Sequence, residues 1–141
     1  MKISTKGRYA VRLLIDMANN DGEQPIKVKD IAARQGLSEK YLEQIIAALN
    51  KGGIVNSIRG AGGGYQLARP ASDITVGEVL RITEGSLSPV ACMDQELEAC
   101  NRCESCESLG VWKDLADAIN NVVDNVTIAS LVEKQANEKI S

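Results

Sequence analysis

Four cysteines within about 15 residues are the side chains of this 141-residue chain best suited to chemistry. Cys92, Cys100, Cys103 and Cys106 follow the spacing C-x7-C-x2-C-x2-C. So short a segment could gather three or four thiolates around one ion or cluster at little cost in loop closure. Iron–sulfur clusters are held by thiolates, whereas all-cysteine zinc sites usually come from two separated pairs. The spacing favours an iron–sulfur cluster, and zinc or redox-active thiols remain as alternatives.

The composition excludes most other chemistry. The chain contains no histidine, so it cannot form a Ser-His-Asp or Cys-His catalytic arrangement or a His-ligated metal site by itself. No positioned acid–base pair is evident either, and we expect no enzymatic activity. The first eight residues contain no apolar stretch of signal-peptide length, and no apolar run is long enough to cross a bilayer. We therefore expect a cytoplasmic protein with no membrane partner.

Charge divides the chain into a basic and an acidic half. Residues 1–70 carry 11 Lys and Arg against six Asp and Glu, which gives a net charge of +5. Residues 71–141 carry five Lys and Arg against 13 Asp and Glu, which gives −8. This asymmetry indicates that a polyanion such as DNA would meet the first half.

The basic half has the pattern of a helix-turn-helix. A first helix follows Ser4-Thr5 and has a buried stripe at Ala10, Leu13, Leu14, Met17 and Ala18. A short helix over Lys29–Gln35 ends at Gly36, which accepts a left-handed backbone. Ser38 then caps a helix over Glu39–Lys51, whose apolar side is backed by leucine and isoleucine. This geometry is that of a recognition helix held by a rigid support.

A hairpin follows directly and completes a winged helix. Ile54–Ile58 and Tyr65–Ala68 have the pattern of two strands, joined by a glycine-rich tip that carries Arg59. Such a tip could lie close to the DNA backbone, with the arginine in a minor groove. A nucleotide-binding loop is the alternative, but Tyr65 stands where that motif needs glycine. Thr75 to Glu78 then form a capping box that opens a helix to about Glu84.

The pattern of the last third of the chain predicts a dimer. A long helix from about Val111 to Val126 has an apolar stripe that a domain this small cannot cover alone, so pairing with a second copy is expected. Thr127 caps a last short helix, and the end from Gln135 to Ser141 has the pattern of a frayed tail. The predicted fold class is mainly α with a small β-hairpin wing. We divide the chain into a DNA-binding domain (1–85), a cysteine loop (86–110) and a dimerisation helix with a tail (111–141).

Four sequence stretches occur together in one order, and their joint occurrence is highly specific although no single stretch is. They are the opening MKISTKGRYAVRLLIDMA, the helix segment YLEQII, the wing RGAGGGYQLARP and the cysteine loop that leads into Trp112. From about Met1 to Leu131, the chain therefore resembles the IscR-type iron–sulfur-sensing winged helix-turn-helix transcription regulators. The resemblance implies homodimers that bind a double-stranded DNA operator, often as repressors, and that sense cluster status through the loop before the long helix.

The resemblance also implies which residues of this chain would bind the metal. The three cluster-binding cysteines of the family fall on Cys92, Cys100 and Cys106, and Cys103 is additional. The histidine that completes the family site is replaced by Leu109. Cys103 is then the best internal candidate for the fourth ligand, with nearby glutamates behind it. A 2Fe–2S cluster is favoured over a 4Fe–4S cluster.

The candidate DNA contacts come partly from the residue pattern and partly from the resemblance. Gln can read adenine, Glu can accept from cytosine, and Lys or Arg at the start of the first helix can meet phosphates. The candidates are Lys6, Arg8, Ser38, Tyr41, Glu43, Gln44, Arg59 and Gly60.

Other readings remain open. A winged-helix regulator with a structural zinc or a thiol switch would use the same cysteines, and nitric-oxide and iron sensors of the family share the three-cysteine layout. Relatives without cysteines respond to cysteine metabolism, and the four cysteines disfavour that branch. An electron-carrying or cluster-delivering protein would leave the winged helix unexplained.

Overall fold

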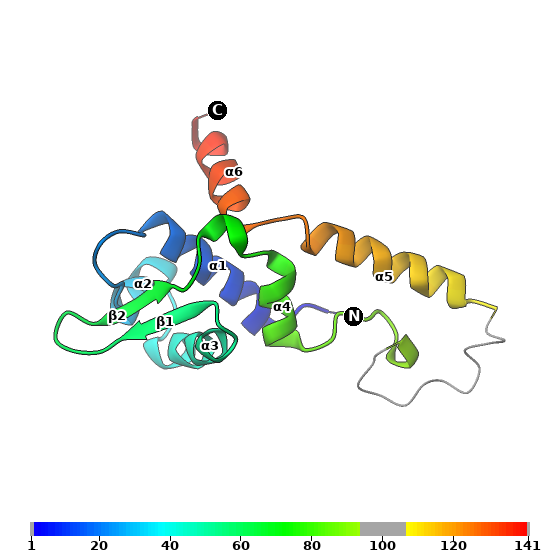
Figure 1. Ribbon diagram of the computed structural model, residues 1–141, viewed down its shortest axis with the longest axis horizontal. Helices are drawn as coiled ribbons and strands as arrows, with labels where there is room; N and C mark the ends of the chain where they lie inside the picture. Colours follow the sequence, from blue (N-terminus) through cyan, green and yellow to red (C-terminus); the bar gives the residue numbers. More distant parts are fainter. Residues whose placement is uncertain (1, 94–106, 141) are drawn as a thin grey trace.

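The computed structural model describes residues 2–93 and 107–140 (Figure 1). Within them the chain forms mainly helices and one two-stranded hairpin, so the expected fold class is confirmed. No helix in these residues is both long and apolar enough to cross a membrane. The elements are α1 (Thr5–Asn19), α2 (Val28–Gln35), α3 (Glu39–Lys51), β1 (Val55–Ile58), β2 (Gly64–Leu67), η1 (Ala71–Asp73), α4 (Val76–Glu84), η2 (Ala91–Met93), α5 (Leu109–Val123) and α6 (Ile128–Ile140).

Local capping fixes the starts of α1 and α3 and the end of α2. The Ser4 hydroxyl accepts a hydrogen bond from the Gly7 amide, and the Ser38 hydroxyl accepts one from the Tyr41 amide, each at 3.1 Å. Gly36 ends α2 with φ of 67°, a left-handed conformation that suits glycine. The turn between α2 and α3 therefore has the predicted form, although α2 begins one residue earlier than expected.

An aliphatic core joins the helices to the base of the hairpin. Because the chain contains no phenylalanine, close packing here depends on branched aliphatic side chains. The largest fully buried side chains come from α1, α2, α3, the start of the hairpin, the segment before α4 and the start of α6: Leu13, Leu14, Met17, Ile31, Leu42, Ile45, Ile46, Leu49, Ile54, Val55, Ile74 and Ile128.

The wing is attached to the segment that precedes α2. Strands β1 and β2 pair antiparallel from Val55 opposite Leu67 to Ile58 opposite Gly64. Ile26 adds a third partner, because it exchanges two backbone hydrogen bonds of 2.8 Å with Tyr65. A Cβ atom at Gly64 would collide with the Ile26 backbone, so this close approach requires glycine. The wing is thereby tied directly to the start of the helix-turn-helix.

A buried carboxylate links α1 to the end of α2. Asp16 is 5% exposed and receives hydrogen bonds from Arg34 at 2.7 and 3.0 Å and from Gln35 at 2.9 Å. The Asp16 carboxylate raises the pKa of Arg34 through this hydrogen-bonded pair. Gln35 in turn accepts a hydrogen bond from Arg12 at 3.0 Å. One polar network therefore holds the supporting helix of the helix-turn-helix against α1.

The last helix returns to the first. Ile128 is fully buried, α6 contacts α1, and the Asn19 amide donates to Gln135 at 3.1 Å. The prediction of a frayed tail from Gln135 was wrong, because α6 continues to Ile140. The apolar side of α6 is stabilised by packing against α1, which local propensity alone does not reveal.

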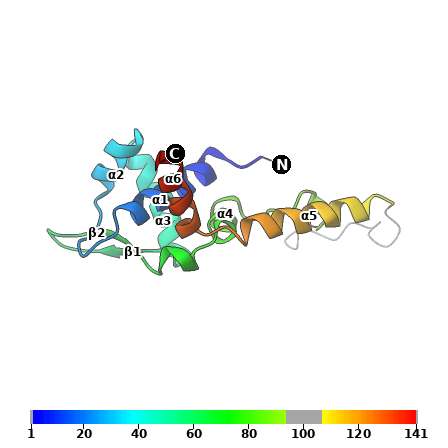
Figure 2. The same ribbon diagram turned by 90° about the horizontal axis from the view of Figure 1, so that it is seen from above.

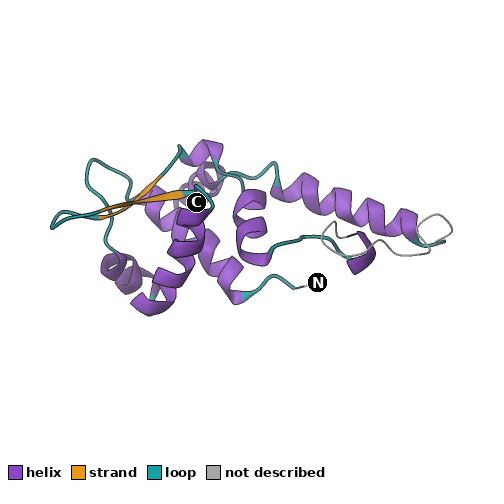
Figure 3. Ribbon diagram, turned by 60° about the horizontal axis from the view of Figure 1, so that its bottom comes forward, coloured by secondary structure: helices purple, strands orange, loops and turns teal. Residues whose placement is uncertain are grey.

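Helix α5 extends away from this body. The wing and α5 lie at opposite ends of the molecule in two perpendicular views (Figures 1 and 2). The secondary-structure view likewise shows the strands at one end and α5 at the other (Figure 3). No residue of α5 is buried, and Val111, Leu115 and Val122 are 61%, 43% and 63% exposed.

Replacing Arg34 tests the buried network. In the pairs Arg34–Asp16 and Arg69–Glu78 the two arginine side chains are equally exposed, at 38%, but the carboxylate side chains differ, with 4% exposed for Asp16 and 40% for Glu78. Arg34→Ala leaves a carboxylate buried without its ion partner, and we expect it to lower the free energy of unfolding by about 3 kcal/mol. The control Arg69→Ala should cost at most about 1 kcal/mol. Urea denaturation at one fixed protein concentration measures both, and equal losses would contradict the assignment.

Candidate DNA-binding surface and cysteine segment

Helix α3 separates its two sides as a recognition helix must. Its buried stripe faces the core, while Glu39, Lys40, Glu43 and Gln44 are exposed. The two predicted base-reading candidates, Glu43 and Gln44, are therefore free to meet a groove. Ser38 is exposed at the amino end of the same helix, where it acts as the N-cap.

Tyr41 is more constrained than the sequence suggested. Its ring packs edge to face against Tyr9 of α1, with the ring centroids 5.9 Å apart, and the side chain is only partly exposed. The Arg12 guanidinium lies over the other ring, 5.1 Å from the Tyr9 centroid. Arg12 and Tyr9 were absent from the predicted site. They position the start of α3 against α1, and only the tertiary contact identifies them.

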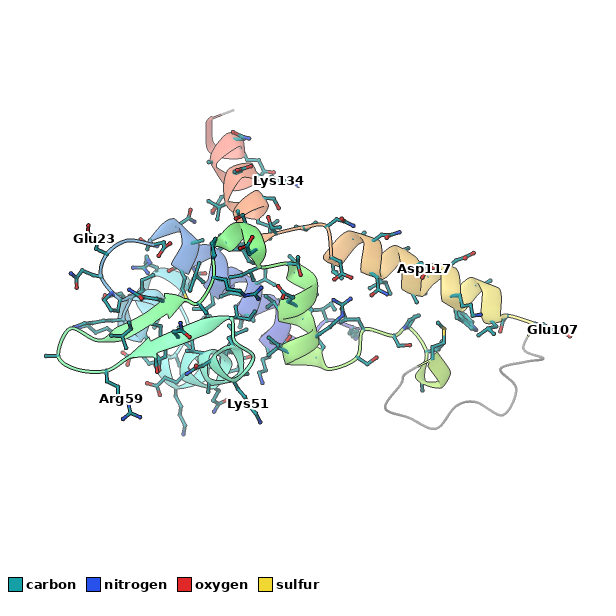
Figure 4. All side chains as sticks on the ribbon, viewed as in Figure 1. Glu23, Lys51, Arg59, Glu107, Asp117 and Lys134 are labelled. Carbon is teal, nitrogen blue, oxygen red and sulfur yellow. The ribbon has the colours of Figure 1, made fainter. Side chains whose placement is uncertain are left out.

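The wing presents one arginine at its tip. Arg59 and Gly60 are exposed, and Gly60 has φ of 108°, which other residues rarely adopt. The Gly63 amide donates to the Gly60 carbonyl at 3.0 Å, so the tip has a defined turn. Figure 4 shows Arg59 and Lys51, from the end of α3, directed toward the same side of the molecule. The tip can therefore approach a backbone that α3 also meets.

The start of α1 carries the remaining two cationic candidates. Lys6 is partly exposed and Arg8 is exposed, and the Arg8 guanidinium donates to the Thr5 hydroxyl at 3.1 Å. The Tyr9–Tyr41 contact places these first turns of α1 beside the amino end of α3. The cations at the start of α1 and the exposed residues at the start of α3 thus form one candidate surface for phosphates.

The cysteine segment lies mostly outside the described residues. Cys92 is part of the short turn η2, and Cys100, Cys103 and Cys106 fall between 94 and 106. Their predicted ligation of a metal therefore stays a prediction. In the described part of the chain, no group of three or more Cys, His, Asp or Glu residues is arranged to hold a metal ion.

Comparison with known proteins decides the family. Residues 3–134 match the family described as Rrf2, iron-dependent transcriptional regulator. The chain belongs to the Rrf2 family. It is 44% identical to the protein rrf2 of Nitratidesulfovibrio vulgaris, across 94% of this chain and 87% of that one. It is 41% identical to the transcriptional regulator IscR of Serratia proteamaculans, across 96% of this chain and 81% of that one.

Solved structures of the family share the fold. The CymR structure, described as the global cysteine regulator of B. subtilis, has a TM-score of 0.79 at 39% identity and covers 95% of this chain and 98% of that chain. The IscR structure of T. potens has a TM-score of 0.76 at 41% identity and covers 96% and 88%. This Rrf2-family chain is thus a DNA-binding transcription regulator and not an enzyme, as the sequence predicted.

Replacing Arg59 tests the role of the wing. Arg59→Ala removes the cation at the tip, and we expect operator binding to weaken by about 1–3 kcal/mol without loss of the fold. Lys134→Ala makes the same change in charge on α6, which Figure 4 shows on the opposite side of the molecule, and it should leave affinity unchanged. Fluorescence anisotropy with labelled operator DNA measures both. An Arg59 variant with wild-type affinity would show that the wing does not touch DNA.

Proposed function

We propose that this chain is a cytoplasmic homodimeric regulator that binds operator DNA and responds to an iron–sulfur cluster held by its cysteine segment. The genes it controls are then those of iron–sulfur cluster biogenesis. The observation that supports this proposal most strongly is the group of four cysteines just before α5, in a chain about 40% identical to IscR proteins. The donor set fits such a cluster, because thiolates are its usual ligands and the chain has no histidine.

Three thiolates form the core of the proposed site. Cys92, Cys100 and Cys106 hold the cluster, and Cys103 supplies the fourth thiolate of a 2Fe–2S centre. Leu109, which stands where the related regulators have a histidine, is the first residue of α5 and has no donor atom. Within the cysteine segment, Cys103 is the candidate that would complete the site.

The exposed stripe of α5 supports a dimer. Val111, Leu115 and Val122 expose 43–63% of their surface on a helix with no buried residue. Contiguous apolar surface of this kind is typical of protein interfaces. A second copy of α5 would bury it on both chains, which is the self-complementary arrangement of a two-fold dimer.

The position of the cysteine segment suggests how a cluster would act on DNA binding. Residues 85–108 connect α4, which belongs to the DNA-binding body, with α5, which belongs to the proposed dimer. Thiolates of this segment that together held a cluster would restrain the connection. A coupling of about 1–3 kcal/mol between cluster and DNA would change operator affinity several-fold to a hundred-fold.

A regulator that senses something else is the second candidate. The likeness to CymR, a global cysteine regulator, favours it, since the TM-score of 0.79 spans nearly the whole chain. In this case the cysteines would hold zinc or act as a thiol switch. Nitric-oxide or iron sensing would use the same ligands as the main proposal.

Cysteine variants test the proposed ligands. We expect Cys92→Ala, Cys100→Ala and Cys106→Ala each to abolish cluster binding, since each removes one of three framework thiolates. Cys103→Ala is the matched control, and it should retain an altered cluster. Iron and sulfide counts with absorption spectra of anaerobically purified protein measure the outcome. Full iron and sulfide in any of the first three variants would refute the assignment, and one zinc without sulfide would favour the second candidate.

Variants of α5 test the dimer. Ile119→Asp places a charge in the apolar stripe, and we expect it to weaken association by several kcal/mol, since an unpaired charge would be buried. Asn121→Asp adds the same charge at an exposed position off the stripe and should leave the dimer intact. Sedimentation equilibrium measures both. A dimeric Ile119 variant would place the interface elsewhere.

A further inference from the structure

Helix α4 holds α5 and α1 through two side chains one turn apart. Arg81 donates to the Asp124 carboxylate at 2.6 and 3.1 Å and to the Asn120 side chain at 2.9 Å, at the carboxyl end of α5. Three residues later, the Glu84 carboxylate accepts from the Ser4 backbone amide at 3.0 Å and from its hydroxyl at 2.6 Å. Ser4 is the N-cap of α1, the helix that carries Lys6 and Arg8.

A buried glycine lies next to the carboxylate in each of these two contacts, the one of Arg81 with Asp124 and the one of Glu84 with Ser4. A Cβ atom at Gly77 would overlap the Asp124 carboxylate, and one at Gly7 would overlap the Glu84 carboxylate. Both contacts therefore depend on a close approach that glycine alone permits. The Arg81–Asp124 pair is also electrostatically favourable, because the guanidinium lowers the pKa of Asp124 and the carboxylate raises the pKa of Arg81.

The orientation of α5 rests on few contacts. The helix has no buried residue, and in the views of Figures 1 and 3 it projects from the body beside α4. After α5, the backbone is bound to the start of α4 by hydrogen bonds of 2.9 Å between Val76 and Val126 and between Ile128 and Ile74. These bonds attach the end of the helix, while the Arg81 contacts with Asn120 and Asp124 restrain its direction.

We propose that the Arg81–Glu84 turn of α4 determines which spacing of operator half-sites the dimer accepts. This rests on the proposed function, in which α5 joins two DNA-binding bodies. The 15 residues of α5 span about 22 Å at 1.5 Å per residue, so a small change of its angle to α4 moves the far end by several ångströms. Two recognition helices must meet half-sites about 34 Å apart, one turn of the double helix. In this proposal the contacts of Arg81, whose ion pair with Asp124 is partly exposed, and of Glu84 restrain that separation.

A series of operators with different spacers tests the proposal. Half-sites are first found by selecting from a random duplex pool with the full-length wild-type protein, and pairs are then built with spacers changed one base pair at a time. Wild-type affinity should peak at one spacer and fall about tenfold within two base pairs, a loss comparable to one mismatched base pair. Arg81→Ala and Glu84→Ala should flatten this dependence to about threefold or less, while the affinity of Arg81→Ala for a single half-site stays unchanged.

Two further variants separate positioning from a merely structural role. Glu84→Gln keeps an oxygen that accepts from Ser4, so it should keep the wild-type spacing preference. Arg69→Ala breaks an ion pair of α4 that touches neither α1 nor α5, and it should also keep the preference. If Arg81→Ala or Glu84→Ala folds and retains the wild-type peak, the proposal is overturned. It is also overturned if the wild type binds all spacers equally, whereas failure of the wild type to bind any paired site refutes the proposed function itself.

Discussion

The buried carboxylate of Asp16 joins α1 to the end of α2. Asp16 lies on the inner side of α1, and burying its charge without partners would be strongly unfavourable. Arg34 and Gln35, the last two residues of α2, supply those partners just before the Gly36 turn. These hydrogen bonds hold the end of α2 against α1, and the chain then enters α3 through the Gly36 turn.

The same network reaches the proposed DNA-binding surface. Gln35 accepts from Arg12, Arg12 lies over Tyr9, and Tyr9 packs against Tyr41 in the first turn of α3. On the other side of the body, the pairing of Ile26 with Tyr65 fixes the wing to the segment before α2. Recognition helix, wing and the start of α1 are thus held as one rigid unit. In the proposed dimer, regulation would require only that two such units be moved relative to each other.

The sequence predicts most of the local structure, because its signals are local. Ser4, Ser38 and Thr75 cap helices through hydrogen bonds to amides three residues ahead, and Gly36 ends α2 by its own backbone freedom. The contacts that the sequence does not reveal join distant residues. Ile26 pairs with Tyr65, Ser4 with Glu84, and α6 with α1, and no spacing rule links such positions. Of the candidate site, the exposed face of α3 and the wing tip follow from periodicity and glycine content. The constraint on Tyr41 does not, because it depends on a tertiary partner.

The proposed function depends above all on coupling between the cysteine segment and DNA binding. The most direct measurement of this coupling is the operator affinity of one anaerobic preparation before and after its cluster is removed, with the salt concentration held constant because phosphate contacts depend on it. We expect affinity for at least one operator to change between several-fold and a hundred-fold. Binding curves that superimpose for the loaded and the cluster-free protein at every operator would contradict the account.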